Sequence, residues 1–457
     1  MSVAGDRRAP LLSRLLTAYG MLCVLVLLAG FFSVATLQEQ QPTGEAAARS
    51  LARQLEGRSF AGARVVIVGR GGEEDARFAS ALAARVRELS GTVMLTVTGD
   101  PAEVRAALES LAVRGTPRFV VATTEGAAPI VRSVLQSLPT IGGARVLTPE
   151  PYRWPTFLLP ENLRNVANQI AVIAILAVGM TMVIVTGGID LSVGSLIALA
   201  AVVTASLIGR MGGEGAGTGA MVASGVATIV LCGAIGAFSG VMITRFAVPP
   251  FIATLAVMQV ASGLAYIVSE GRPVYQVPQG FVLLGRGADP LLGIPWAVLL
   301  MGALYAAAHV VMSRTVLGRY IYAVGGNAEA ARLAGVRVAA VLLFVYAACG
   351  ALAGLGGVVM ASQLRSGAPT YGLMYELYVI AAVVVGGTSL SGGEGTIPGT
   401  LVGAFIIAVT QNGMNLTHVE SYTQKVVLGL VILGAVLLDR LKQRGLRGRG
   451  RSRDGGA

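Results

Sequence analysis

Long apolar stretches without charged side chains recur along this chain and limit what it can fold into. A helix that crosses a bilayer needs about 20 mostly apolar residues, so each stretch predicts one span. The first lies between Arg14 and Glu39, and the others cover residues 166–186, 191–209, 220–243, 251–269, 295–313, 338–361, 377–391, 397–416 and 422–438. Together they predict an all-α polytopic membrane protein with about ten transmembrane helices.

Two of these spans are less regular than the others, and the first has a second interpretation. Segment 377–391 is short and either spans or re-enters the membrane, and Lys425 shortens the run at 422–438. Ser33-Val34-Ala35 resembles a signal-peptidase site, although the apolar run before it is longer than a usual signal core. We expect a retained anchor here, and a cleaved signal is the alternative.

The composition supports a membrane protein and argues against a nucleic-acid partner. Only 13% of the residues are charged, whereas soluble domains average about 25%. The net charge of +11 comes from basic residues at the termini and between apolar stretches, where they orient a membrane protein. Cys23, Cys232 and Cys349 all lie inside apolar runs, which indicates buried thiols and neither a disulfide framework nor a metal site.

The basic residues also predict the orientation. With ten spans, three basic clusters fall on one side, which the positive-inside rule places in the cytoplasm of a bacterial inner membrane. The predicted parts are a cytoplasmic N-terminus with the first span (1–37), an extracytoplasmic insertion (38–155), a core of nine further spans (156–439) and a basic cytoplasmic tail (440–457). The clusters are Arg7, Arg8 and Arg14; Arg314, Arg319, Arg332 and Arg337; and Arg440, Lys442, Arg444, Arg447, Arg449, Arg451 and Arg453.

Residues 38–155 alternate strand and helix patterns, which predicts a small inserted α/β domain with a mostly parallel sheet. Asp100 is a natural N-cap, with Pro101 at the first helical position. The predicted strands are 64–69, 92–98, 118–123 and 144–147, and the predicted helices are 73–90, 101–114 and 127–138.

The start of this domain suggests a nucleotide site, but the residues argue against one. After the glycine turn at 69–72, a dinucleotide fingerprint needs a further glycine where Glu74 stands. Acidic residues fill positions 73–75, the first helical turn, and would repel a phosphate. Neither Lys425 nor Lys442 follows a glycine, as a phosphate loop requires. We therefore expect no cofactor on this chain, and ATP with its magnesium on a separate subunit.

The stretch VTGGIDLSVGS (185–195) places one ionisable residue, Asp190, in an apolar context. The glycines around it break a helix, and the freed backbone groups need protein or a water-filled path in a bilayer. A carboxylate there marks a functional site by default. The alternative is that Asp190 only caps the next helix, through the amides of residues 192–193. The broken-helix residues are Gly187, Gly188, Asp190, Ser192 and Gly194.

The stretch TVLGRYIYAVGGNAEAARLAGVRV (315–338) lies in a basic loop and predicts a short helix capped by Asn327. The helix continues through Arg332 and ends at Gly335, with alanines on one face and Glu329 and Arg332 as polar groups. It suits docking to a partner, and a membrane-surface connector is the alternative. The candidate docking residues are Gly326, Asn327, Glu329, Ala331, Arg332, Leu333 and Gly335.

A third stretch, residues 375–416, combines glycine pairs at 386–387 and 392–393 with amides in an apolar span. Gln411, Asn412 and Asn415 either line a polar path for hydroxyl-rich cargo or tie helices together. Small residues four positions apart predict close helix packing. These pairs are Gly399/Gly403, Gly236/Gly240 and Gly350/Gly354.

These stretches together resemble the permease family of ABC importers for ribose, xylose, galactose and related sugars. The similarity runs from about Phe157 to Asp439 and includes VTGGIDLSVGS, GRYIYAVGGNAEAARLAG, VVVGGTSLSGGEGTIPGT and VPPFIATLAVMQVASGLA. The resemblance implies a homodimeric pore, two ATP-hydrolysing subunits beneath it and an external sugar-binding protein. It also implies that Asn327–Gly335 receives the ATPase, and that this chain is a transport subunit and not an enzyme.

The chain departs from that family at two places. Tyr378 stands where an acidic residue commonly follows the sequence YEL, which puts a role for that position in doubt. Residues 38–155 separate the first span from the FLLPENLRN segment that normally follows it closely. The strand and helix order of this insertion loosely resembles one lobe of a sugar-binding protein. We expect it either to contact the incoming binding protein or to guard the pore mouth.

Two other functions remain open at this stage. The same transporter class can carry nucleosides, autoinducer-type signals or other small polar solutes, because specificity in it rests largely with the external binding protein. A membrane-anchored sensor whose outer domain detects a ligand is an alternative of a different class. The long pore-type stretches argue for transport.

Overall fold

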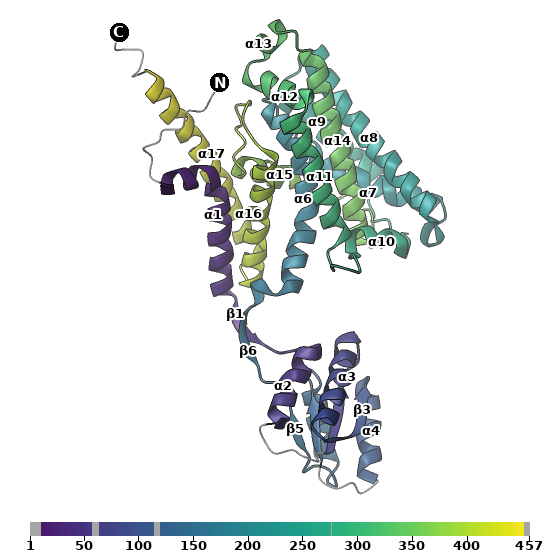
Figure 1. Ribbon diagram of the computed structural model, residues 1–457. Coiled ribbons are helices and arrows are strands. Elements are labelled where there is room, and N and C mark those ends of the chain that lie inside the picture. The colour runs from purple at the N-terminus through teal and green to yellow at the C-terminus, as the bar shows by residue number, and fades with distance from the viewer. Residues whose placement is uncertain (1–10, 57–63, 114–118, 276, 452–457) are drawn as a thin grey trace. The chain divides into compact units, whose positions relative to one another are not determined.

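The computed structural model describes residues 11–56, 64–113, 119–275 and 277–451, and only the backbone of residues 11–19, 435 and 438–451. Arg7 and Arg8 of the first basic cluster, and Arg453 of the last, lie outside the described residues. The chain divides into two compact units, one of residues 37–156 and one of residues 1–36 with 157–457. The first unit is α/β and the second is helical (Figure 1).

All ten predicted spans are helices in the helical unit. Three of them are shorter apolar helices: residues Gly20–Ala35 of α1 (Leu11–Ala35), α15 (Tyr375–Val385) and residues Ser421–Gly434 of α17 (Ser421–Arg451). The prediction of an all-α membrane unit is therefore confirmed. Within the part of the chain that the structure describes, seven helices are long and apolar enough to cross a bilayer: α6 (Pro160–Val185), α7 (Val193–Arg210), α8 (Thr218–Arg245), α9 (Pro250–Val268), α11 (Trp296–Arg314), α14 (Val338–Leu364) and α16 (Ile397–Leu416).

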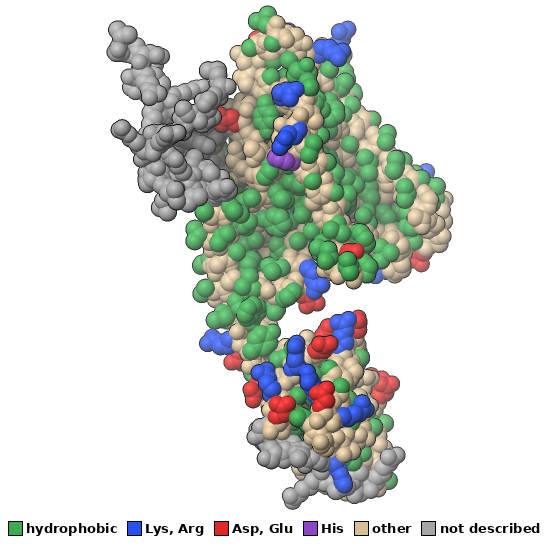
Figure 2. Space-filling view, viewed as in Figure 1, with side chains coloured by type: hydrophobic (Ala, Val, Ile, Leu, Met, Phe, Trp, Pro, Cys, Tyr) green, Lys and Arg blue, Asp and Glu red, His purple; other side chains and the backbone are tan. Residues whose placement is uncertain are grey.

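Shorter helices connect these spans. They are η1 (Thr156–Leu158), η2 (Gly213–Gly215), α10 (Gln279–Arg286), α12 (Val316–Gly326) and α13 (Ala328–Leu333). Hydrophobic side chains cover the middle of the visible face of the helical unit, and most charged ones lie toward its ends (Figure 2). That distribution is what a bilayer requires of a helix bundle.

Glycine spacing explains how closely the helices approach one another. Helix α14 packs against α6, α7 and α8. A Cβ atom at Gly236 would overlap the Tyr346 carbonyl, and one at Gly350 would overlap the Cys232 carbonyl. Gly403 is equally close to Ala382 of α15. The predicted small-residue contacts are thus confirmed for the α8–α14 and α15–α16 pairs.

The predicted short run 377–391 is helical only as far as Val385, where α15 ends, and the loop that follows contains the rest of it. Helix α15 has 11 residues, so it extends about 16 Å and cannot cross a bilayer alone. Before it, the chain runs along α7, where Gly367 lies against Ala201 and Gly372 against Gly194. Gln363 at the end of α14 bonds to the start of α6, while α15 leads to the start of α16, where Thr400 bonds to Thr181. Residues 363–400 therefore run from the part of the bundle near the start of α6 toward the part near its end.

Two of the three cysteines match their predicted burial. Cys232 and Cys349 are buried free thiols, whereas Cys23 is exposed on α1. The prediction was wrong for Cys23 because much of the described surface of α1, including Val26 and Leu27, is not covered by other helices.

The inserted unit leaves and rejoins the helical unit at one place. The backbone amide of Phe157 donates a 3.1 Å hydrogen bond to the hydroxyl of Thr36, the last residue before the insertion. Phe32 and Phe157 pack with Val409 and Met414 near the end of α16. Both attachment points are therefore at the end of the bundle where α6 begins and α16 ends.

The α/β unit has a four-stranded parallel sheet in the order β3-β2-β4-β5. Its strands are β2 (Arg64–Gly69), β3 (Thr92–Thr98), β4 (Val120–Thr123) and β5 (Arg145–Leu147). Helices α2 (Gly44–Glu56) and α3 (Glu73–Glu88) pack on one face, and α4 (Pro101–Val113) and α5 (Ala128–Ser137) pack on the other. Strand β2 is buried on both faces, as a central parallel strand should be.

The first and last strands of this unit, β1 (Leu37–Gln40) and β6 (Tyr152–Pro155), pair as an antiparallel two-stranded ribbon. The predicted strands and helices are confirmed to within two residues at each end, and α2 and the ribbon were not predicted. The Asp100 carboxylate accepts hydrogen bonds from the amides of Ala102 (2.8 Å) and Glu103 (2.9 Å), which confirms the cap.

A side chain of α3, the helix that follows, hydrogen-bonds to the glycine turn after β2. The Asp75 carboxylate accepts a 2.6 Å hydrogen bond from the amide of Arg70, and its Cβ lies where a Cβ at Gly69 would point. Glu73, Glu74 and Asp75 are all in the first turn of α3. The Asp75 carboxylate already accepts the hydrogen bond from the Arg70 amide that a bound phosphate would need. This supports the interpretation that the turn only begins a helix and binds no nucleotide.

Candidate translocation and coupling sites

The break between α6 and α7 is organised by Asp190. Residues 186–192 are not helical, and Gly187 has φ = 82°, which favours glycine. Oδ1 of Asp190 accepts hydrogen bonds from the amide (2.9 Å) and hydroxyl (2.6 Å) of Ser192, the residue that precedes α7. The predicted bond to the amide of residue 192 is therefore confirmed, whereas α7 itself has no side-chain cap.

A single oxygen of Asp190 makes these bonds, which leaves its other oxygen unused. Asp190 and Tyr346 of α14 are both fully buried, and Asp190 Oδ2 and the Tyr346 hydroxyl have no hydrogen-bond partner among the described residues. The Cys349 thiol is close enough to interact with the carboxylate. An unpaired buried polar group typically costs about 1–3 kcal/mol, so the hydrogen bonds to Ser192 alone do not explain this carboxylate.

Helix α9 holds the same loop from the other side. The hydroxyl of Thr254 accepts a 3.1 Å hydrogen bond from the amide of Leu191, and its proton is within reach of the carbonyls of Pro250 (3.0 Å) and Ile189 (3.3 Å). The unwound backbone therefore finds protein partners, as a bilayer requires. Residues 189–192 are fixed by α9 as well as by the Asp190 side chain.

The three glycine-rich stretches of the sequence meet in one place. The amide of Gly393 donates a 2.8 Å hydrogen bond to the carbonyl of Val185, the last residue of α6. Gly325 of α12 approaches the same carbonyl so closely that a Cβ would overlap it. A Cβ at Gly392 would lie 2.8 Å from the carbonyl of Gly325 and 3.1 Å from the amide of Gly187. We call these five residues (185, 187, 325, 392 and 393) the glycine junction.

A side-chain hydrogen bond adds a further connection from α12. The Tyr322 hydroxyl donates to the carbonyl of Gly395 at 2.7 Å. Burial raises the pKa of this phenol, so it remains a neutral donor at physiological pH. Helix α12 is therefore joined directly to the loop that connects α15 and α16.

Helix α13 follows α12 and presents most of its surface to solvent. The Asn327 side chain caps it by accepting a 3.0 Å hydrogen bond from the amide of Ala330, and Gly335 ends it with φ = 86°. Glu329 and Arg332 form an exposed ion pair of 3.0 Å. Ala331 is buried, whereas Leu333 is 89% exposed. The predicted helix and its cap are confirmed, and an exposed apolar side chain beside an ion pair suits a protein contact.

Gln411, Asn412 and Asn415 take different roles. Asn412 and Asn162 of α6 exchange amide hydrogen bonds of 2.9 and 3.0 Å, so this pair ties two helices. Gln411 and Asn415 instead line a cleft of about 180 Å³. The cleft is lined by Val166, Gln169, Ile170 and Ile173 of α6, Tyr375 and Tyr378 of α15, Ala408, Gln411 and Asn415 of α16, and Gln424 of α17.

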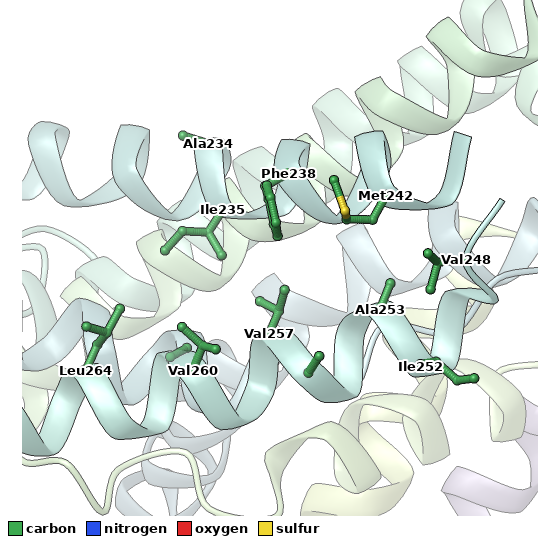
Figure 3. Close-up of a pocket in the computed structure, with 12 residues that line it drawn as sticks. Ala234, Ile235, Phe238, Met242, Val248, Ile252, Ala253, Val257, Val260 and Leu264 are labelled. Carbon is green, nitrogen blue, oxygen red and sulfur yellow. The ribbon is translucent and has the colours of Figure 1, made fainter. Parts of the chain in front are cut away.

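A larger groove of about 540 Å³ lies between α8 and α9 (Figure 3). Its lining side chains, which include Phe238, Met242 and Val257, are all hydrophobic. A groove of this composition on membrane helices suits a lipid chain and offers nothing to a polar cargo. The smaller cleft is thus the better candidate for a polar solute.

Several residues of these sites were not found from the sequence. Gln169, Tyr375 and Gln424 line the cleft, and Tyr346 and Thr254 surround the broken helix. An amide at position 169, at the start of an apolar run, was the one local signal of a polar site. Tyr378, whose role the sequence put in doubt, lies in the cleft.

Comparison with known proteins agrees with this architecture. Residues 162–436 match the family model described as "Branched-chain amino acid transport system / permease component". The ribose import permease protein RbsC of Escherichia coli (strain K12) is 47% identical over 294 residues, which cover 63% of this chain and 88% of that protein. RbsC of Bacillus subtilis (strain 168) is 44% identical over 297 residues, covering 63% and 87%.

A third relative is named for the transport of a different pentose, L-arabinose. The L-arabinose transport system permease protein AraH of Escherichia coli (strain K12) is 37% identical over 293 residues, covering 64% of this chain and 87% of that protein. No solved structure matches the chain. The match to the family model extends over more than half of the chain, so the chain belongs to the family of branched-chain amino acid transport system permease components, alongside the ribose and arabinose permeases.

Proposed function

We propose that this chain is the membrane subunit of an ATP-binding-cassette importer for a ribose-like monosaccharide. The observation that carries the proposal is the similarity to ribose import permeases, which extends over most of their length. In this proposal an external binding protein delivers the sugar, two copies of the chain form the pore, and a separate subunit hydrolyses ATP.

The proposed orientation places α13 and both termini in the cytoplasm. The basic residues near α13, including Arg319 and Arg337, support this placement by the positive-inside rule. The cleft residues of α6 and α16 lie toward the opposite ends of those helices from the glycine junction. The cleft would then open toward the side from which the sugar arrives.

We assign ATPase contact to α13 and the residues beside it, from Gly326 to Gly335. Its exposed ion pair and the exposed Leu333 give a partner both charge and apolar area to recognise. Movement of α13 would be transmitted through α12 to the glycine junction, because Gly325 of α12 belongs to the junction and Tyr322 bonds to Gly395 in the adjoining loop. The broken helix with Gly187, Gly188, Asp190, Ser192 and Gly194 would respond as the inner part of the path.

For the inserted unit we propose a role in handing over the cargo. It attaches beside the end of α16, the helix that contributes Gln411 and Asn415 to the cleft. A contact with the binding protein at this place would position the sugar near the cleft. Guarding the pore mouth is the second role compatible with this attachment.

Uptake of labelled D-ribose by bacteria that lack their own ribose permease tests the proposal. The cells express this chain with the ATPase and binding protein encoded beside it, and matched cells lack the ATPase. We expect concentrative uptake in the first cells alone. Equal uptake in both would show that the chain is not an ATP-driven permease.

A further inference from the structure

The cleft is built by helix faces that the sequence periodicity brings together. Val166, Ile170 and Ile173 of α6 share one face with Gln169, and Ala408, Gln411 and Asn415 of α16 recur at positions i, i+3 and i+7. Polar groups from four helices therefore line one cleft, in which Gln169 and Asn415 are exposed and Gln411, Tyr375, Tyr378 and Gln424 are partly buried.

The polar lining of the cleft carries no charge. It consists of four side-chain amides and two phenols. Gln424 bonds to Asn415 at 2.8 Å, but the side chains of Gln169, Gln411, Tyr375 and Tyr378 have no hydrogen-bond partner among the described residues. Uncommitted amides both donate and accept, which matches the hydroxyl groups of a polyol.

The carboxylate of Glu376 is directed away from the cleft. Glu376 lies between the two tyrosines in the sequence, but its carboxylate lies against Gly194 of α7, where a Cβ would overlap it. Tyr375 and Tyr378 contact each other edge to face, with ring centroids 6.0 Å apart. They add apolar ring surface and hydroxyl groups to the same wall, which suits a solute with both C–H and O–H groups.

We propose that this cleft binds an uncharged, hydroxyl-rich solute and excludes solutes with a net charge or a zwitterionic amino-acid group. The inference rests on the proposed function and adds the location and the selection rule. A carboxylate or ammonium group would lose its hydration there without an opposite charge among the lining side chains, and that loss is costly. The cleft thus favours sugars over branched-chain amino acids, the solutes that appear in the name of the family.

Protection of an introduced thiol tests the proposal on the assembled transporter. The background carries Cys23→Ser, since Cys23 is exposed while Cys232 and Cys349 are buried. Gln411→Cys places a thiol in the cleft, and Glu420→Cys places one outside it, on an exposed residue of the α16–α17 connection. The rate of reaction with a small water-soluble thiol reagent is measured with D-ribose, L-arabinose, L-leucine or no solute.

We expect D-ribose, supplied at a concentration several times its Kd, to slow the modification of Gln411→Cys at least about 3-fold, because a bound solute covers the thiol and the fraction of empty sites falls by mass action. L-leucine should leave the rate unchanged, and Glu420→Cys should react equally in all conditions. Protection by neither sugar, in a transporter that still takes up D-ribose, would overturn the inference and leave the proposed function intact. Equal protection by leucine would overturn the selection rule.

A binding readout that does not depend on cysteine chemistry comes from uptake. Gln411→Leu removes an amide from the cleft, and Thr410→Val removes a hydroxyl that bonds within its own helix to Ile406. We expect Gln411→Leu to reduce D-ribose uptake about 3- to 10-fold at equal abundance, and Thr410→Val to retain it. Equal uptake by the two variants would contradict the proposal.

Discussion

The backbone amide of Gly393 donates its hydrogen bond to the carbonyl of Val185, so the loop after α15 closes directly on the end of α6. Gly325 of α12 approaches the same carbonyl, and no side chain fits between them. The two interrupted helical segments therefore share one contact with α12, the helix that precedes the segment proposed to bind the ATPase. A displacement of α12 by even a small distance must move or break this junction, because packed backbones do not compress.

Because Gly325 lies directly against the Val185 carbonyl, we predict that no residue with a side chain is tolerated at position 325. In Gly325→Ala the added Cβ would overlap the Val185 carbonyl, so the junction must separate. We expect lower abundance in the membrane and a lower melting temperature, equivalent to about 2 kcal/mol or more. The measurement is the thermal stability of the purified protein.

Gly326 supplies the matched control for this variant. An added Cβ there has no neighbour within 4 Å. Gly326→Ala should melt within the error of the unmodified protein. If the two alanine variants have the same stability, the close packing of the glycine junction is wrong.

Charge reversal on α13 distinguishes two roles of Glu329 and Arg332: the ion pair that they form with each other, and the proposed contact with the ATPase. Glu329→Arg or Arg332→Glu should reduce co-purification of the ATPase several-fold, while helix stability changes little, because exposed pairs contribute about 0–1 kcal/mol. The double exchange restores the pair but reverses the charges offered to a partner. We expect it to remain defective, and recovery of ATPase binding would indicate that only the internal pair matters.

Asp190 bonds to Ser192 with one oxygen, which predicts different results for two substitutions. Asp190→Asn keeps an acceptor for Ser192 and should retain stability, whereas Asp190→Ala should lose about 1–2 kcal/mol. We expect uptake by Asp190→Asn to fall to about one tenth or less, since a buried carboxylate within membrane helices marks function. Uptake equal to that of the unmodified chain would show that Asp190 only hydrogen-bonds to Ser192 and has no role in transport.

The pair Asn162–Asn412 predicts a measurable interaction between α6 and α16. Each amide donates to the other, and both are partly buried. A double-mutant cycle with alanine at both positions should give a coupling energy of about 0.5–1.5 kcal/mol. Additive effects of the two substitutions would show that the bonds do not form in the membrane.

Deletion of residues 42–152 tests the role of the insertion. The main core of the helical unit contains none of these residues, so the shortened chain should fold and bind the ATPase. We expect weaker association with the binding protein and slower uptake. If uptake and binding-protein affinity both stay unchanged, neither proposed role of the insertion holds.

The sequence allowed the spans and the parallel sheet to be predicted because both depend on local hydrophobic patterns. Helix α2 was not predicted, although Ala47, Ala48, Leu51 and Leu55 recur at helical spacing. Two of these are alanines, whose small apolar surface gives a weak periodic signal. The cap at Asp100 and the helix capped by Asn327 were predicted because capping depends on neighbours in the sequence.

The candidate site was predictable in its parts but not in its assembly. The glycines at 325 and 393 are visible in the sequence, yet only tertiary packing brings both of them to the carbonyl of Val185. Likewise Gln411 was an evident polar residue, but its neighbours Gln169 and Tyr378 come from helices distant in the sequence. No local pattern distinguishes Gln411, which faces the cleft, from Asn412, which ties two helices.

Uptake by the purified transporter tests the central claim most directly. Proteoliposomes containing this chain, the ATPase and the binding protein are supplied with labelled D-ribose and with ATP on the ATPase side. We predict accumulation that stops when the ATPase is omitted or ATP is replaced by a non-hydrolysable analogue. Equal accumulation without the ATPase, or none with the complete system, would contradict the account.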